Sequence, residues 1–237
     1  MKLSGATALV TGANRGIGEH FAHGLLQRGA KVYATARRPE SVNIPGVEVL
    51  ALDITDQASV DAAAAAAGDV DVLINNAADA AGGNLVTGDL TAIRSTMESN
   101  YFGTLAMIRA FAPILARNGG GAILNVLSAA AWTTVLGNTA YAASKSAEWG
   151  LTNAVRLELQ EQGTLVSALV PGLIGTQTLF DFAERHGIEF AEGAVLDPAD
   201  LVTLALDGLE ADEVEILDAH SVEAKATLAG PPQTFNL

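Results

Sequence analysis

The first forty residues contain the pattern that restricts the fold of this chain most. A short apolar run at 6–10 is followed by Thr-Gly-Ala-Asn-Arg-Gly-Ile-Gly at 11–18, and then by an amphipathic stretch at 19–28. This order predicts a buried β-strand that passes through a glycine-rich turn directly into an α-helix. Glycines let the backbone approach a phosphate, and a helix N-terminus offers free N–H groups. The sequence therefore predicts a phosphate-binding turn, although its spacing is G-x-x-x-G-x-G rather than G-x-G-x-x-G.

Strand-like and helix-like segments alternate along the rest of the chain. Strands are expected at 6–10, 31–36, 47–52, 70–74, 122–127, 165–170 and 214–217, and helices at 19–28, 57–67, 90–118, 141–162 and 198–209, with a last helical turn or two at 221–229. Such alternation predicts one α/β domain over residues 1–237, with a doubly wound parallel sheet of about seven strands and helices on both faces. Segment 173–192 has no clear period, and 230–237 is expected to be a loose tail.

Composition narrows the classes of function. The net charge of −14 argues against nucleic acid as a partner. With no cysteine, the chain has neither disulfides nor thiolate chemistry. The longest uncharged stretch, 118–144, is interrupted by glycines and asparagines, and the start lacks the apolar core of a signal peptide, so we expect a cytoplasmic protein without membrane spans. His20 and His23 have no third ligand nearby in the sequence, so no metal site is predicted.

Charge is distributed unevenly along the chain. Residues 1–40 hold six basic and two acidic side chains, whereas residues 181–223 hold thirteen acidic side chains and one basic. A basic region in an acidic protein indicates a local anionic ligand, while the acidic end is more typical of a solvated face. The second predicted strand ends in Ala36, Arg37 and Arg38. An acid at this point takes the ribose 2′-hydroxyl of NAD, and an arginine accommodates the 2′-phosphate of NADP, so these residues favour NADP(H). Two ordinary surface arginines are the alternative.

A hydroxyl, a phenol and an ammonium follow the predicted strand at 122–127. Tyr141 lies thirteen residues after Ser128, and Lys145 four residues after Tyr141. Residues four apart share a helix face, so the phenol and the ammonium point the same way. Making a tyrosine exchange protons near pH 7 costs about 3–4 kcal/mol, and a cation about 4 Å away at an effective dielectric of 20 supplies on the order of 4 kcal/mol. The spacing predicts an acid–base site; a chance pattern with a surface lysine is the alternative.

Taken together, these motifs resemble the classical short-chain dehydrogenase/reductase family from about residue 6 to residue 217. The matching motifs are TGANRGIG at 11–18, Asp53 after the third strand, NNAA at 75–78, Asn100 in NYFG, Ser128, YAASK at 141–145 and PGLIGT at 171–176. The resemblance implies a Rossmann-type fold and an NADP(H)-dependent oxidoreductase that reduces a hydrophobic ketone or aldehyde to an alcohol, reversibly. Alternatives are an NAD-dependent alcohol or hydroxysteroid-type dehydrogenase and a non-catalytic dinucleotide sensor.

The resemblance also implies a role for each catalytic residue. Tyr141 is then the general acid in carbonyl reduction and the base in alcohol oxidation. Lys145 holds the nicotinamide ribose and lowers the pKa of Tyr141. Ser128 orients the substrate oxygen, and Asn100 supports a water that links Lys145 to solvent.

Cofactor and substrate contacts are implied in the same way. The cofactor-binding residues are Gly12, Asn14, Arg15, Gly16, Ile17, Gly18, Arg37, Arg38, Asp53, Ile54, Asn76, Ala77, Ala78, Tyr141, Lys145, Pro171, Gly172, Ile174 and Thr176. Among them, the three glycines cradle the pyrophosphate, Asp53 meets the adenine, Asn76 the adenine ribose side, and Thr176 the carboxamide end. Substrate contacts are expected from Ser128, Ala130, Trp132, Leu136, Tyr141 and Phe180, with core packing as the alternative for Leu136 and Trp132.

The chain departs from the family pattern at two places. Ala78 stands where the family often has glycine, and the C-terminal DEVEILDAHSVEAKATLAG replaces a glycine-rich strand. Because that end commonly packs at a subunit interface, the assembly is open; a homodimer or homotetramer through the helices at 90–118 and 141–162 is expected. Segment 173–192 follows the cofactor-contacting Pro171 and Gly172, so we expect it to form a substrate lid.

Overall fold

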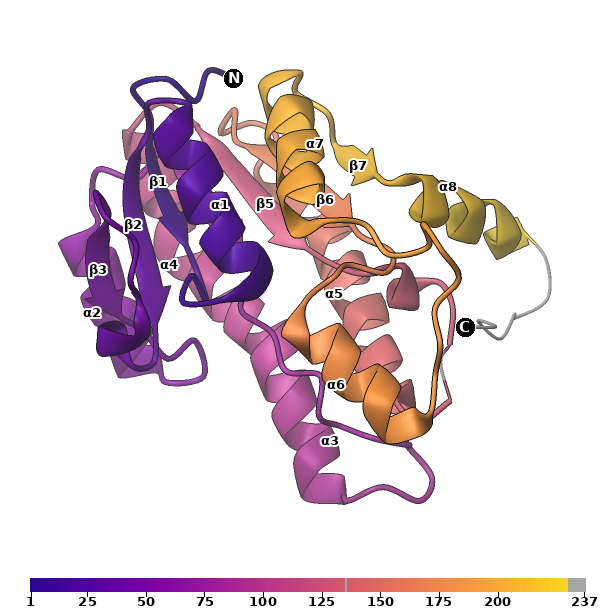
Figure 1. Cartoon of the computed structure of the whole chain (residues 1–237). Coiled ribbons are helices and arrows are strands. Elements are labelled where there is room, and N and C mark those ends of the chain that lie inside the picture. Colours follow the sequence, from indigo (N-terminus) through magenta and orange to yellow (C-terminus); the bar gives the residue numbers. More distant parts are fainter. Residues whose placement is uncertain (135, 230–237) are drawn as a thin grey trace.

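Seven parallel strands form a single sheet in the computed structural model, which describes residues 1–134 and 136–229 (Figure 1). The strands are β1 (Thr7–Val10), β2 (Lys31–Ala36), β3 (Glu48–Ala51), β4 (Val72–Asn75), β5 (Ala122–Val126), β6 (Leu165–Val170) and β7 (Glu215–Leu217), in the spatial order β3-β2-β1-β4-β5-β6-β7. The predicted doubly wound α/β sheet is confirmed. The tail predicted to be loose, 230–237, lies outside the described residues.

Eight α-helices connect and cover these strands within the described residues. They are α1 (Gly16–Gln27), α2 (Gln57–Ala66), α3 (Leu90–Met97), α4 (Thr104–Arg117), α5 (Thr139–Glu158), α6 (Gln177–His186), α7 (Pro198–Glu210) and α8 (Ala219–Ala226). Short turns add η1 (Pro39–Ser41), η2 (Glu98–Gly103), η3 (Ala129–Ala131) and η4 (Thr227–Ala229). None of the described helices is both long and apolar enough to cross a membrane.

The alternation of side chains along the strands divides the core into two layers. On β1, Ala8 and Val10 face a cluster that includes Phe21 of α1 and Leu201 of α7, whereas Leu9 faces a second cluster with α2, α4 and α5. Successive side chains of a strand point to opposite faces, so a strand covered on both sides is apolar at every position. Burial of a side chain such as Leu9 contributes about 1.5–3 kcal/mol.

The structure refines several helix boundaries. Residues 90–118 are not one regular α-helix, because a π-helical turn, η2, separates α3 from α4. The aperiodic segment 173–192 contains α6, which begins after an N-cap at Thr176 and ends at Gly187, whose φ is 64°. A left-handed glycine is a common helix C-cap, so this stop signal was readable in the sequence. Helix α1 starts at Gly16, inside the glycine motif.

The chain reverses its winding between β1 and β4. From β1 it proceeds outward to β2 and β3, and from β4 outward to β7 on the other side. Ligands of such sheets bind at this crevice, beyond the carboxyl ends of the strands. The motifs at 11–18, 75–78, 128 and 171–176 all follow strand ends at this edge, and α3 and α6 extend beyond it in the lower part of Figure 1.

Candidate active site

The glycine turn leaves the first turn of α1 free to bind an anion. Gly12 and Gly16 have φ values of 66° and 57°, the left-handed region that favours glycine. A Cβ added to Gly18 would lie 2.2 Å from the carbonyl oxygen of Gly12, so no side chain fits there. Arg15, the N-cap of α1, provides no side-chain cap, whereas aspartates cap α2, α3 and α7. The unpaired N–H groups of α1 and its dipole therefore suit the pyrophosphate of a dinucleotide.

Asn76 holds this turn in place. Its Nδ2 donates to the carbonyl oxygens of Thr11 and Gly12 at 2.9 and 3.2 Å. The Thr11 hydroxyl in turn accepts from the backbone N–H groups of Asn76 and Ala77, both at 2.9 Å. The Asn76 amide is thus engaged with the glycine turn itself. Sequence reasoning missed Thr11, which opens the TGANRGIG motif. Ala78 has no left-handed φ, so it fits where the family often has glycine.

Arg37 and Arg38 directly follow β2, and Arg15 belongs to the glycine turn that contacts the end of this strand. Arg15, Arg37 and Arg38 are exposed, and none forms an ion pair within the described part of the chain. The backbone N–H of Ala13 donates to the carbonyl oxygen of Thr35 at 2.8 Å, which holds the glycine turn against the end of β2. Ala36 is buried. This corner of the molecule is therefore positive and carries no acid at position 36.

Asp53 lies beside this positive corner. Burial alone would raise its pKa, but hydrogen bonds from the Thr55 hydroxyl and backbone N–H, together with the positive charge of Arg37, lower the pKa overall. Asp53 is therefore ionised at neutral pH. Its neighbour Ile54 is buried and packs in the core, close to Gly103.

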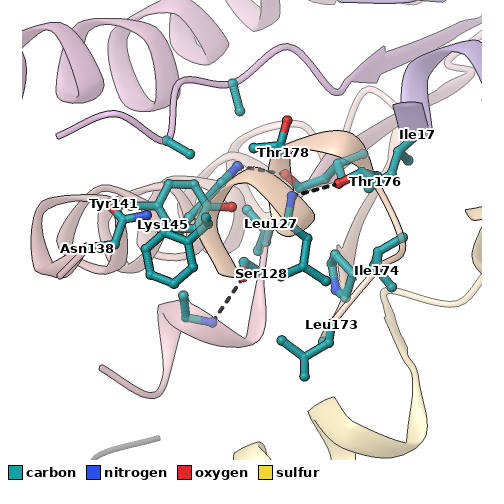
Figure 2. Close-up of a pocket in the computed structure, with 18 of the residues that line it drawn as sticks. Ile17, Leu127, Ser128, Asn138, Tyr141, Lys145, Leu173, Ile174, Thr176 and Thr178 are labelled. Atoms are coloured by element: carbon teal, nitrogen blue, oxygen red, sulfur yellow. Dashed lines mark hydrogen bonds between the residues drawn. The ribbon is translucent and has the colours of Figure 1, made fainter. Parts of the chain in front are cut away.

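A cavity of about 250 Å³ gathers many of the predicted residues at the sheet edge (Figure 2). Its lining includes eleven of them: Ile17, Asn76, Ala78, Ser128, Ala130, Tyr141, Lys145, Pro171, Gly172, Ile174 and Thr176. The other lining residues are Ala80, Val126, Leu127, Asn138, Leu173, Thr178, Leu179, Phe182 and Arg185. In Figure 2, Tyr141 and Asn138 lie at one end of the cavity, Ile17 and Thr176 lie at the other, and Ser128 lies between them.

The hydroxyl groups of Ser128 and Tyr141, which both line this cavity, can each form a further hydrogen bond. The Ser128 Oγ accepts from the backbone N–H of Ala130 at 3.1 Å, which fixes the oxygen while leaving its hydrogen free to donate. Ser128 follows the end of β5, and Tyr141 lies in the first turn of α5. The Tyr141 hydroxyl has no hydrogen-bond partner among the residues described. Both groups can therefore contact a ligand oxygen.

Lys145 is buried in an ion pair that the sequence analysis did not anticipate. Its Nζ donates to the carbonyl oxygen of Val126 at 2.8 Å and to Glu148 Oε2 at 2.6 Å, and lies 5.9 Å from the centre of the Tyr141 ring. Both side chains of the pair are only 2% exposed. Burial alone would lower the pKa of Lys145, but the Glu148 carboxylate raises it overall, so the ammonium stays charged. One ammonium hydrogen remains for a ribose hydroxyl.

The second oxygen of Glu148 is held by α4. Thr104 Oγ1 donates to Glu148 Oε1 at 3.1 Å. Burial raises the pKa of Glu148, and the ammonium of Lys145 and the Thr104 hydroxyl offset this only in part. The one signal in the sequence was the spacing of three residues between Lys145 and Glu148, which places them on one helix face.

Asn100 connects the loop after β4 to α5. Its Oδ1 accepts from the backbone N–H of Asp79 at 2.7 Å, and its Nδ2 donates to the Asp79 carbonyl oxygen and to Ser144 Oγ, both at 2.8 Å. The residue is completely buried in η2. Because both amide hydrogens are used, this side chain can only accept a hydrogen bond from a water.

Three of the predicted substrate contacts, Trp132, Leu136 and Phe180, lie outside the lining of this cavity. The Trp132 ring packs edge-on against Trp149, with centroids 6.0 Å apart. Leu136 is 75% exposed. Phe180 is 47% exposed and does not belong to the face of α6 that lines the cavity. Leu173, Leu179 and Phe182 supply the apolar wall in their place.

Comparison with known proteins identifies the family. Residues 6–186, more than half of the chain, match the short chain dehydrogenase family. The chain belongs to the short-chain dehydrogenase/reductase family. It is therefore an oxidoreductase of a family that binds a nicotinamide cofactor, and the predicted resemblance is confirmed.

Three relatives illustrate the range within this family. Sorbitol dehydrogenase of Cereibacter sphaeroides is 35% identical over 185 residues, covering 73% of this chain and 72% of the relative. A short-chain dehydrogenase of Burkholderia cenocepacia, solved in complex with NADP, is 36% identical with a TM-score of 0.88, covering 97% and 95% of the two chains. The 3-ketoacyl-(acyl-carrier-protein) reductase of Brucella melitensis, solved with NADH, is 30% identical with a TM-score of 0.82, covering 92% and 99%.

Proposed function

We propose that this short-chain dehydrogenase/reductase is an NADP(H)-dependent carbonyl reductase that interconverts a hydrophobic ketone or aldehyde and its alcohol. The observation that carries this proposal is the placement of the Ser128 and Tyr141 hydroxyls in one cavity, with the Lys145 ammonium buried next to them. The apolar side chains of Leu173, Leu179 and Phe182 support a hydrophobic substrate.

In this mechanism a bound nicotinamide cofactor supplies or accepts the hydride. Ser128 donates a hydrogen bond to the substrate oxygen and holds it at the phenol of Tyr141. Tyr141 gives its proton to that oxygen in reduction and takes it back in oxidation. Lys145, fixed by Val126 and Glu148, directs its remaining hydrogen to the cofactor ribose and favours the charged form of the phenol by its positive charge.

We propose that the remaining predicted contacts hold the cofactor. The glycine turn of 11–18 would bind the pyrophosphate, and Ile174 and Thr176 would hold the nicotinamide end, beside Ile17 in the same cavity. Thr178, in the first turn of α6, also lines this end of the cavity and is the first residue of the helix face that lines it. Segment 173–192, which carries α6, would then act as the lid that closes over substrate and nicotinamide.

The choice of NADP(H) rests on the positive corner at β2. Arg15, Arg37 and Arg38 are exposed and unpaired within the described chain, and the buried Ala36 leaves the position of the NAD-selective acid without a charge. The NADP complex of the Burkholderia cenocepacia relative agrees with this choice. An NAD-dependent dehydrogenase is the second candidate, since the Brucella melitensis reductase was solved with NADH.

Cofactor preference provides the first test. The wild type should consume NADPH with a broad panel of ketones and aldehydes, and should prefer NADPH over NADH by at least roughly tenfold to a hundredfold in kcat/KM, because hydrogen bonds to charged groups contribute about 1.5–3 kcal/mol each. Arg37→Ala should weaken NADPH and leave NADH nearly unchanged. Ala36→Asp should favour NADH by adding a ribose partner and a repulsive charge.

Steady-state kinetics with both cofactors measure this preference. Arg117→Ala, at the C-terminal end of α4, is the matched control, because it makes the same change at an exposed arginine near the opposite edge of the sheet. Equal use of NADH and NADPH by the wild type would overturn the assignment to NADP(H). Better kinetics with phosphorylated sugars than with aryl or alkyl ketones would count against the hydrophobic substrate.

We also propose that the chain is a single domain that assembles into a homodimer or homotetramer through the helical stretches 90–118, which holds α3, η2 and α4, and 141–162, most of which is α5. The exposed Phe102 and Leu157, on the helical stretches 90–118 and 141–162, support such an interface. The cytoplasmic location expected from the sequence stays a prediction.

A further inference from the structure

The inner face of α6 changes in character along its length. Thr178, Leu179, Phe182 and Arg185 all line the cavity. Positions 178, 182 and 185 are four and three residues apart, so they lie on one helix face. At a rise of 1.5 Å per residue, Arg185 lies roughly 10 Å along the axis from Thr178. A ligand that extends along this face would meet first a hydroxyl, then apolar side chains, then a guanidinium.

Arg185 brings a positive charge to a mostly apolar wall and forms no ion pair within the described residues. The cavity lining contains no aspartate or glutamate, and its other cation, Lys145, is paired with Glu148. The Nε of Arg185 donates to the carbonyl oxygen of Asp181 at 3.0 Å, within α6. Its two terminal nitrogens have no partner among the described residues, and the Asp181 carboxylate accepts from Gln177 instead. The guanidinium fork is therefore available to a ligand.

Asn138 offers a second polar group at the same end of the cavity. Its side-chain Oδ1 is buried without a hydrogen-bond partner in the described chain, and it lines the cavity. The preceding Gly137 packs against the ring of His186, since a Cβ added to Gly137 would lie 2.7 Å from that ring. His186 directly follows Arg185, and its ring lies against that of Phe182, with centroids 4.4 Å apart and the ring planes tilted by 38°. This contact places the backbones that carry Asn138 and Arg185 next to each other.

We infer that the substrate carries one anionic group, a carboxylate, which Arg185 binds together with Asn138 at the end of the cavity away from the nicotinamide. The fork of an arginine matches the two oxygens of a carboxylate. Turning the carboxamide of Asn138 exchanges its oxygen and nitrogen in place, so the group presents an N–H to the anion. The substrate class is then an oxo acid, or the corresponding hydroxy acid, whose apolar chain lies along Leu179 and Phe182. This inference rests on the proposed function of the site.

Binding of an unreactive acid tests the site without turnover. Isothermal titration calorimetry should compare octanoate with octanamide, which share a chain and differ in charge, on the protein with and without NADP⁺. Octanoate should bind at least about tenfold more tightly, because hydrogen bonds to a charged group contribute about 1.5–3 kcal/mol. Arg185→Gln should abolish the difference, and Asn138→Ala should reduce it. The control Arg117→Gln should retain it. Equal binding of acid and amide by the wild type, or a preference that survives Arg185→Gln, would overturn the inference.

Turnover separates this inference from the proposed function. An aliphatic oxo acid should show a higher kcat/KM than its methyl ester, mainly through KM, and Arg185→Gln should equalise the two by lowering the value for the acid. Turnover of esters and acids alike, with no effect of Arg185→Gln, would refute the carboxylate site and leave the reductase standing. Arg185-dependent binding of octanoate without turnover of any carbonyl compound would refute the reductase and leave the anion site.

Discussion

Replacing Tyr141 by phenylalanine should lower kcat for carbonyl reduction by at least about a hundredfold and up to about ten-thousandfold, the range that general acid catalysis supplies. The substitution keeps the ring and removes only the proton that the substrate oxygen receives. The Tyr141 hydroxyl has no partner among the described residues, so its loss leaves no buried group unsatisfied. Affinity for NADPH should change little, because the Lys145 ammonium and the glycine turn remain. Stopped-flow measurement of carbonyl reduction gives the rate, and a fluorescence titration with NADPH gives the affinity.

A second tyrosine supplies the matched control for this experiment. Tyr101 lies in η2 and packs edge-on against Phe102, with centroids 5.0 Å apart, outside the cavity lining. Tyr101→Phe makes the same chemical change away from the reacting groups, so its kcat should stay close to that of the wild type. If Tyr141→Phe retained more than a tenth of wild-type turnover in a clean preparation, Tyr141 would not be the proton donor.

The parts of the fold that local patterns determine were predictable. Short apolar runs followed by polar motifs predicted the parallel sheet, and the carboxyl ends of parallel strands meet at one edge. By that rule, the sequence alone placed Ser128, which follows β5, at the same edge of the sheet as the NNAA segment, which follows β4. Tyr141 and Lys145 needed only the helical spacing of four residues. The start of α1 inside the glycine motif and the π-helical turn η2 depend on tertiary packing instead.

Side-chain contacts between elements that are distant in the sequence could not be predicted. Trp132 was expected to line the substrate pocket, whereas its ring packs edge-on against Trp149 of α5 and stays outside the cavity lining. The Lys145–Glu148 pair is local in sequence, yet it is buried, and its carboxylate accepts a hydrogen bond from Thr104 of α4, 44 positions before Glu148. A sequence shows that Glu148 can reach Lys145, but it does not show that both are removed from water. That distinction decides whether removing one partner of the ion pair costs almost nothing or several kcal/mol.

Replacing Glu148 by alanine should therefore lower the free energy of unfolding at neutral pH by about 3–5 kcal/mol, because it leaves the Lys145 ammonium buried and uncompensated. Urea denaturation followed by tryptophan fluorescence measures the change. Glu158→Ala removes an exposed carboxylate from the last turn of the same helix and should have little effect. The double variant Lys145→Met with Glu148→Leu replaces the pair by apolar groups, and should recover most of the lost stability.

The pH dependence of this loss distinguishes an uncompensated charge from a simple packing defect. In the wild type, Glu148 raises the pKa of Lys145 above its ordinary value of 10.5. While Glu148 is ionised, this stabilisation is therefore fully present below pH 10.5 and is lost as the pH rises through the higher, folded-state pKa of Lys145. Without Glu148, burial lowers the pKa of Lys145, so the unfolded variant binds more protons than the folded one and its stability rises with pH. The difference in unfolding free energy between wild type and Glu148→Ala should shrink between pH 7 and about pH 10. A constant difference over that range would mean that the lost carboxylate acts through packing, and that Lys145 does not carry a buried charge.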